Sequence, residues 1–158
     1  MSFRNYDNVE EHIKETYLKI RTNQTYDFVK KVHQKYLKYF TPMKVWSVLL
    51  KLDNFVDISD PDISLPNIHH AFQTAEAIRK DGLPDWLQLV GLIHDLGKVL
   101  YQFGCDEDGT SMKEQWSIVG DTFVVGCQLP DTNIYPEFNQ LNPDSKNPNY
   151  NTKYGIYD

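Results

Sequence analysis

The sequence predicts an all-α fold, and three observations lead to that prediction. Apolar residues recur with the period of a helix in successive segments along the chain. The first half contains no run in which apolar and polar residues alternate as they do in a strand. Proline, glycine and asparagine stand between the segments, where helices end. With 158 residues, the chain has the size of one domain and is long enough to bury a sizeable core.

Three helices are predicted in the N-terminal part. Residues 8–20 and 26–39 each carry an apolar stripe at helical spacing, and Thr25 is the predicted N-cap of the second helix. Residues 42–52 are apolar nearly all round, which predicts a buried helix.

The middle of the chain predicts a loop followed by two helices. Residues 53–67 contain two prolines and several aspartates, which is typical of a surface loop. A helix is expected over residues 67–80. A second helix, with Asp85 as its cap, is expected over residues 86–102.

The remaining residues carry weaker signals. The acidic stretch 103–114 predicts a solvated loop, and residues 116–125 fit either a short helix or an extended segment. Residues 128–158 hold four of the eight prolines and show no apolar period. We expect a helical metal-binding domain over residues 1–127. The irregular segment 128–158 is expected to be disordered or to pack against protein that this chain does not contain.

Composition and charge exclude several classes of protein. Lys and Arg number 16 against 22 Asp and Glu, a net charge of −6, so we expect no nucleic-acid partner. No segment approaches the ~20 apolar residues of a membrane span, and the N-terminus lacks a signal-peptide core, so we expect no membrane association. Two cysteines are too few for a disulfide framework, which favours a cytoplasmic location.

The strongest chemical signal is the set His70, His94, Asp95 and Lys98. The two histidines lie on consecutive predicted helices, and an antiparallel pair would place them opposite each other. Imidazole and carboxylate groups are suitable ligands for iron or zinc. Lys98 shares the helix face of His94 and Asp95, and we expect burial and a metal charge to lower its pKa. Gly97 is expected to allow a close approach of neighbouring groups.

Parts of this pattern also fit other interpretations. A lone His-Asp pair fits a hydrogen-bonded core histidine, and only the whole set favours a metal site. His69 points about 100° away from His70 on a helix and is a predicted non-ligand. No phosphate-binding P-loop and no Gly-x-Ser-x-Gly nucleophile elbow is present.

Long sequence blocks show a more specific likeness. The runs PNIHHAFQTAE, at residues 66–76, and LVGLIHDLGKVL, at residues 89–100, resemble the inositol oxygenase family, as do residues 3–6, 24–29, 56–62 and 120–127. The resemblance implies an HD-domain-like helical bundle with two non-haem irons, which opens the ring of myo-inositol with dioxygen to give D-glucuronate.

The resemblance also implies roles for individual residues. His70, His94 and Asp95 would be iron ligands, with Asp95 bridging two ions. Lys98 would be catalytic and would contact the substrate. The residues expected to hold the polyol are Arg4, Asp57, Ser59, Lys98, Gly120 and Asp121.

The chain departs from the family pattern in two respects. The family takes further ligands, two His and one Asp, and another Lys from a C-terminal half. No histidine follows His94 in this sequence. Two irons need roughly ten to twelve coordination positions, so we expect a truncated family member that holds at most one weakly bound metal. The loop 105–114 is longer and more acidic than the family pattern and is expected to be a surface insertion near the site.

Three functions follow from this sequence. The first is an inositol oxygenase acting on myo-inositol and dioxygen, in association with a missing C-terminal half. The second is an HD-type metal-dependent phosphohydrolase, which fits the His and His-Asp set alone. The third is an inactive remnant that binds a partner.

Overall fold

The structure is a computed structural model that describes residues 6, 8–38, 42–60, 64–118 and 123–158. Within these ranges it is helical and contains no β-strand, only one isolated bridge. This confirms the predicted all-α class. The chain divides into two compact units, Met1–Phe40 with Asp121–Asp158, and Thr41–Gly120. None of the described helices combines the length and apolar composition that a bilayer crossing requires.

The first unit contains helices α1, Glu11–Asn23, and α2, Tyr26–Tyr36. The hydroxyl of Thr25 accepts a hydrogen bond from the backbone N–H of Phe28, so the predicted N-cap of α2 is confirmed. The buried side of α1 includes Ile13, Tyr17 and Ile20, three of the residues that form its apolar stripe.

The C-terminal segment forms three short 3₁₀ helices, η4 (Pro136–Leu141), η5 (Pro143–Lys146) and η6 (Gly155–Tyr157). Of these, η4 packs against α1, and η5 packs against η4. Asn142 is only 1% exposed, and its Nδ2 donates to the carbonyls of Arg21 and Gln24 at 2.7 and 3.0 Å. Asp144 Oδ2 accepts from the N–H of Tyr26, at the start of α2, at 2.7 Å. These contacts contradict the expectation of disorder for these residues, whereas packing against protein that this chain does not contain stays a prediction.

Polar side chains hold this segment. Asn142 and Asp144 satisfy backbone groups at helix ends, and such contacts leave no apolar period in the sequence. The predicted division into a metal-binding domain over residues 1–127 and an irregular segment over residues 128–158 stays a prediction.

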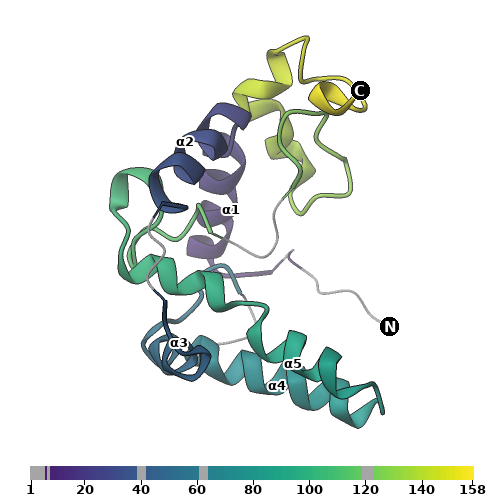
Figure 1. Ribbon diagram of the computed structural model, residues 1–158. Coiled ribbons are helices and arrows are strands. Elements are labelled where there is room, and N and C mark those ends of the chain that lie inside the picture. The colour runs from purple at the N-terminus through teal and green to yellow at the C-terminus, as the bar shows by residue number, and fades with distance from the viewer. Residues whose placement is uncertain (1–5, 7, 39–41, 61–63, 119–122) are drawn as a thin grey trace. The chain divides into compact units, whose positions relative to one another are not determined.

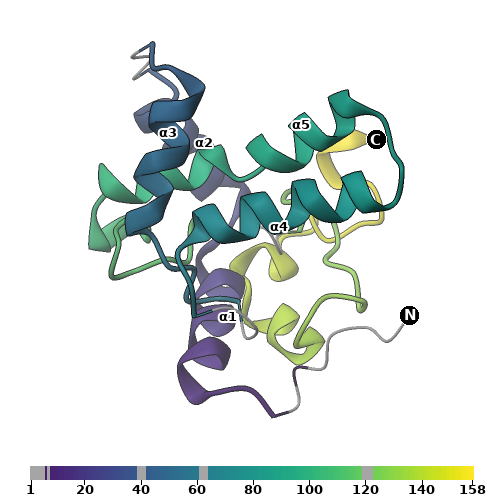
Figure 2. The ribbon, with the colours of Figure 1, turned by 90° about the horizontal axis from the view of Figure 1, so that it is seen from below.

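The second unit contains α3 (Val45–Lys51), η1 (Leu52–Asn54), α4 (Asn67–Lys80), α5 (Asp85–Ile93), η2 (Leu96–Gln102) and η3 (Asp106–Asp108). Helices α4 and α5 run side by side in opposite directions, as Figures 1 and 2 both show. Gly91 permits their close approach, because a Cβ atom there would lie 2.6 Å from Ile78 Cδ1. The core of this unit is a cluster of Val48, Leu52, Ile68 and Val99.

The helix predicted over residues 86–102 is interrupted. Helix α5 ends at Ile93 and η2 begins at Leu96, so His94 and Asp95 lie in the break. His94 Nδ1 lies 2.7 Å from the carbonyl of Gly91, the group that would accept from residue 95 in a continuous helix. Asp85 is the first helical residue and makes no capping hydrogen bond, so its predicted role as the cap is wrong.

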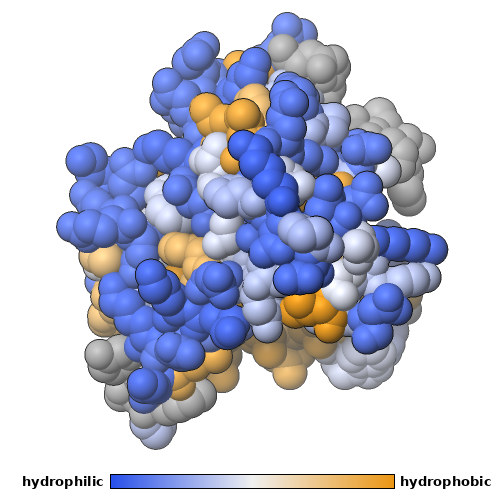
Figure 3. All heavy atoms as spheres, turned by 90° about the horizontal axis from the view of Figure 1, so that it is seen from above, coloured by the Kyte–Doolittle hydropathy of each residue, from blue (hydrophilic) through white to orange (hydrophobic). Residues whose placement is uncertain are grey.

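The helix predicted to be buried, α3, is covered on one side only. Val48 and Leu49 are buried, whereas Trp46 is 56% exposed and Leu50 is 51% exposed. The Trp46 ring meets the ring of Phe72 on α4 edge-on, at 6.4 Å between centroids. On the face of the molecule drawn in Figure 3, hydrophobic patches likewise lie between hydrophilic side chains.

Candidate metal site

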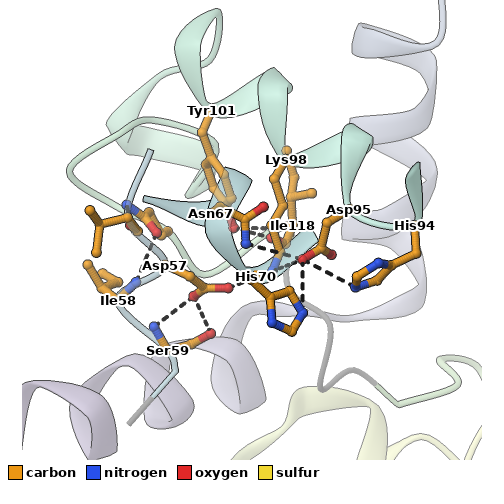
Figure 4. A network of polar contacts seen from close by, with 12 residues as sticks. Asp57, Ile58, Ser59, Asn67, His70, His94, Asp95, Lys98, Tyr101 and Ile118 are labelled. Atoms are coloured by element: carbon orange, nitrogen blue, oxygen red, sulfur yellow. Dashed lines mark hydrogen bonds and ion pairs between the residues drawn. The ribbon is translucent and has the colours of Figure 1, made fainter. Parts of the chain in front are cut away.

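Three potential metal ligands converge in the second unit. His70 comes from α4, and His94 and Asp95 come from the break after α5. The Asp95 Oδ2 atom lies 3.8 Å from His70 Nε2 and 3.5 Å from His94 Nε2, and one ligand atom from each residue lies within 4.8 Å of the others. Figure 4 shows both imidazoles directed toward this carboxylate. The convergence predicted from the sequence is thus present.

These separations suit one cation. Metal–ligand distances of about 2.1 Å place neighbouring ligand atoms about 3.0 to 3.4 Å apart and opposite ones about 4.2 Å apart. The distances of 3.8 and 3.5 Å from Asp95 Oδ2 to the two imidazole nitrogens lie between the value for neighbouring ligand atoms and the value for opposite ones. Three donors leave further coordination positions for other ligands.

A hydrogen bond prepares His94 for metal binding. Its Nδ1 is 2.7 Å from the Gly91 carbonyl oxygen, which can only accept, so neutral His94 carries its proton on Nδ1. The lone pair then lies on Nε2, the nitrogen that faces Asp95. Since Gly91 also brings α4 and α5 together, one residue both positions the helices and orients the ligand.

The Asp95 carboxylate is held by two donors. Its Oδ2 accepts from Lys98 Nζ at 2.8 Å and from Asn67 Nδ2 at 3.2 Å. Burial opposes ionisation of Asp95, but the hydrogen bonds from Lys98 and Asn67 and the Lys98 charge outweigh it and lower the pKa. Asp95 is therefore an anion that can coordinate a cation at neutral pH.

Lys98 lies between two carboxylates. Its Nζ is 2.7 Å from Asp57 Oδ2 and 2.8 Å from Asp95 Oδ2, and the side chain is only 10% exposed. Burial opposes the charge, but both aspartates outweigh it and raise the pKa of Lys98. The two aspartates outweigh the lowering expected from burial, because the sequence did not show that Asp57 reaches the ammonium. The lowering expected from a metal charge stays a prediction. Two of the three N–H groups are used in these described contacts, which leaves one for a ligand.

Asp57 and Ser59 form a tight turn beside Lys98. Asp57 Oδ1 accepts from the backbone N–H of Ser59 at 2.9 Å and from its hydroxyl at 2.6 Å. Two of the residues expected to hold the polyol are thus together, and Asp57 joins them to the metal-ligand group through Lys98. Arg4, Gly120 and Asp121 lie outside the described residues.

Two residues adjacent to the ligands or close to them in sequence, His69 and Gly97, lie outside the converging group. His69 is exposed, and its assignment as a non-ligand stays a prediction. A Cβ atom at Gly97 would meet nothing within 4 Å, so the close approach expected there is wrong. The glycine that permits it is Gly91.

The sequence reasoning missed three residues that support this site. Asn67 is buried at the first position of α4 and bonds Asp95. Gln115 is buried and bonds the backbone on both sides of Asp57. Tyr101 stacks on Phe55, and its hydroxyl bonds the backbone N–H and carbonyl of Ile118. A single amide or phenol has no spacing signal, although Asn67 lies within the family-like block at residues 66–76.

The acidic loop expected to be solvated is folded. It contains η3, and Thr110 within it is buried and forms an isolated antiparallel bridge with Gln115. Gly109 adopts a left-handed backbone with φ of 67°, a conformation that glycine favours.

Comparison with known proteins identifies the family. The family model described as Myo-inositol oxygenase matches residues 10–158. The chain belongs to the myo-inositol oxygenase family. Its match begins in front of α1 and continues through both units, so it includes the candidate metal site and the C-terminal segment.

Curated relatives of the myo-inositol oxygenase family come from distant organisms. The chain is 46% identical to a probable inositol oxygenase of Oryza sativa subsp. japonica, over 99% of this chain and 51% of the relative. It is 43% identical to an inositol oxygenase of Dictyostelium discoideum, over 98% of this chain and 53% of the relative. It is 42% identical to an inositol oxygenase of Danio rerio, over 99% of this chain and 55% of the relative. The chain spans about half the length of the curated relatives it matches.

Proposed function

We propose that the chain provides the metal-binding part of an iron-dependent oxygenase that opens the ring of myo-inositol with dioxygen to give D-glucuronate. The convergence of His70, His94 and Asp95 carries the proposal. Membership of the myo-inositol oxygenase family and the names of the curated relatives support the substrate. A cytoplasmic location is part of the same proposal.

His70, His94 and Asp95 would hold the iron. The family resemblance implies two irons with Asp95 as the bridge, but three side chains offer at most four donor atoms. One weakly bound metal per chain is therefore proposed for these residues. Bound iron would supply Lewis acidity toward substrate oxygens and electrons for dioxygen.

The polyol would bind beside the metal through hydrogen-bonding side chains. A cyclitol presents only hydroxyl groups, which both donate and accept. The remaining N–H of Lys98 would donate to one substrate oxygen, and this charge-assisted bond also stabilises negative charge that develops there. The contacts with Asp57 and Asp95 raise the pKa of Lys98, so the side chain donates as a charged ammonium.

The nearby turn would add further polyol contacts. Asp57 and Ser59 lie beside Lys98 and offer a carboxylate and a hydroxyl. Arg4, Gly120 and Asp121 complete the proposed set on the family resemblance alone.

Association with the remaining half of the relatives is part of the proposal. The exposed apolar residues of the second unit support it: Trp46, Leu50, Phe72, Trp86, Leu89 and Val90. Several of them come from α4 and α5, the helices that carry or precede the metal ligands. A partner that covered them would also add ligands to an incomplete coordination sphere.

The test is a metal titration of the purified chain followed by activity measurements. Co²⁺ is expected to bind with one equivalent per chain and to give a ligand-field absorption spectrum. H70A and H94A are expected to abolish this spectrum, whereas H69A, the neighbouring exposed histidine, keeps it. Retention of the spectrum in H70A and H94A would contradict the site.

The reaction is tested with iron and with the missing half supplied. Oxygen uptake that depends on myo-inositol, measured after Fe²⁺ loading and addition of the C-terminal half of a relative, supports the oxygenase. Metal-dependent release of phosphate from phosphate esters instead supports the phosphohydrolase. A chain that binds no metal but still binds that half supports the inactive remnant.

A further inference from the structure

Gln115 makes a two-point contact with the backbone around Asp57. Its Oε1 accepts from the N–H of Ile58 at 3.2 Å, and its Nε2 donates to the carbonyl of Val56 at 3.0 Å. Gln115 is only 3% exposed. A single side-chain amide therefore pairs with the two backbone groups on either side of residue 57.

This contact restrains the direction of the Asp57 side chain. Two hydrogen bonds to one planar amide fix both the distance and the rotation of the backbone that they hold, in the manner of strand pairing. The group must donate and accept at once, which a carboxylate cannot do when ionised and an apolar side chain cannot do at all. Glutamine meets this demand and has the length to reach across from another loop.

Gln115 is itself held in place. The second hydrogen of its Nε2 goes to the carbonyl of Met112 at 3.0 Å, so both amide hydrogens are used. Its backbone forms the bridge with Thr110, and Ser117 N–H donates to the Gly109 carbonyl at 3.0 Å. The folded acidic loop thus supports the residue that holds the Asp57 turn.

The restraint extends to the proposed polyol site. Asp57 Oδ2 accepts from Lys98 Nζ at 2.7 Å, and Lys98 also contacts Asp95. A rotation of the backbone at residue 57 would move the carboxylate away from the ammonium and change where the remaining N–H of Lys98 points.

We propose that Gln115 is a positioning residue for polyol binding, which acts by fixing Asp57 and, through it, Lys98. This rests on the proposed function, because myo-inositol is the ligand considered. The loop 105–114, expected from the sequence to be a surface insertion, then has a definite role as the support of the binding turn.

The variant Q115M tests the proposal, since methionine keeps the volume and removes all three hydrogen bonds. The affinity of the Co²⁺-loaded chain for myo-inositol, measured by calorimetry, is expected to fall about tenfold, the equivalent of one or two lost hydrogen bonds. The affinity for Co²⁺ is expected to change less than twofold, because the metal ligands do not contact Gln115. Q73A, at an exposed glutamine of α4, is the matched control and keeps both affinities.

A second variant tests whether the effect passes through Asp57. In a D57N background, Q115M is expected to change the polyol affinity less than twofold, because its target is already altered. Hydrogen exchange at the Ile58 amide is expected to quicken in Q115M. Q115E, which keeps an acceptor for Ile58, covers the case in which Q115M does not fold, and it is also expected to weaken polyol binding.

The outcomes separate the two proposals. If the unsubstituted chain binds Co²⁺ but not myo-inositol, the polyol part of the proposed function fails, and this inference fails with it. If it binds both and Q115M and Q115E bind myo-inositol equally well, only the inference is overturned. A full effect of Q115M that persists in the D57N background overturns it as well.

Discussion

Replacing Lys98 with methionine tests the charge arrangement of the site most directly. K98M keeps the length of the side chain but removes the ammonium that lies 2.7 Å from Asp57 Oδ2 and 2.8 Å from Asp95 Oδ2. Both carboxylates are mostly buried. After the substitution, two anions face each other with no cation between them.

The cost can be worked out from these distances. Two oxygens bonded to one nitrogen at 2.7 and 2.8 Å are at most about 5.5 Å apart. At an effective dielectric constant of about 20, two unit charges at that separation repel by about 3 kcal/mol. Breaking buried ion pairs by removing one partner costs about 3 to 5 kcal/mol in other proteins. We expect K98M to lower the free energy of unfolding by a similar amount.

Tryptophan fluorescence in urea reports the unfolding of the compact unit that contains Lys98. All three tryptophans, Trp46, Trp86 and Trp116, lie within Thr41–Gly120. The midpoint for K98M is expected to fall by roughly 1 M urea or more. K80M, which removes an exposed lysine from α4, is the control and should change stability by less than about 0.5 kcal/mol.

A second substitution, D57N, is expected to have opposite effects on stability in the presence and absence of Lys98. D57N alone is expected to destabilise, because it weakens the bond to Lys98. In the K98M background, D57N is expected to stabilise, because it removes one of two repelling charges. The reasoning is refuted if K98M costs less than about 1 kcal/mol, or if D57N has the same sign in both backgrounds.

Three further predictions follow. N142A removes two buried hydrogen bonds to carbonyls at the end of α1 and should cost about 2 to 4 kcal/mol, measured by circular dichroism in urea; a loss under 0.5 kcal/mol would contradict it. G91V forces atoms against Ile78 and should cost about 1 to 3 kcal/mol in thermal unfolding, whereas G97A, at an open position, should show no such cost. Co²⁺ at one hundred times its Kd should stabilise the second unit by about 2.7 kcal/mol; persistence of this gain in H70A would argue against the site.

The sequence predicted the fold class and the convergence of the metal-ligand group because both depend on periodic patterns. Helical spacing located α4 at its observed bounds, and an antiparallel arrangement of consecutive helices brought His70 to His94. The break after α5 was missed because the apolar period continues through Ile93 to Leu96 without a proline. The cause of that break is a local side-chain contact, His94 with the carbonyl of Gly91.

Other features depend on contacts between distant residues, which a single sequence does not display. The raised pKa of Lys98 requires Asp57, which lies 41 positions earlier and is brought in by a loop. The support from Gln115 depends on one amide reaching another loop. The packing of the C-terminal segment depends on Asn142 and Asp144, two residues that are equally common in turns.

Asn142 and Asp144 hold the turn between α1 and α2, and this affects the order in which the protein can fold during synthesis. The groups that complete this turn lie 118 to 121 positions further along the chain. A ribosome working from the N-terminus at about 5 to 20 residues per second therefore exposes α1 and α2 for several seconds before their partners emerge. The opening helices of the nascent polypeptide thus depend for that interval on chaperones or on their own local stability.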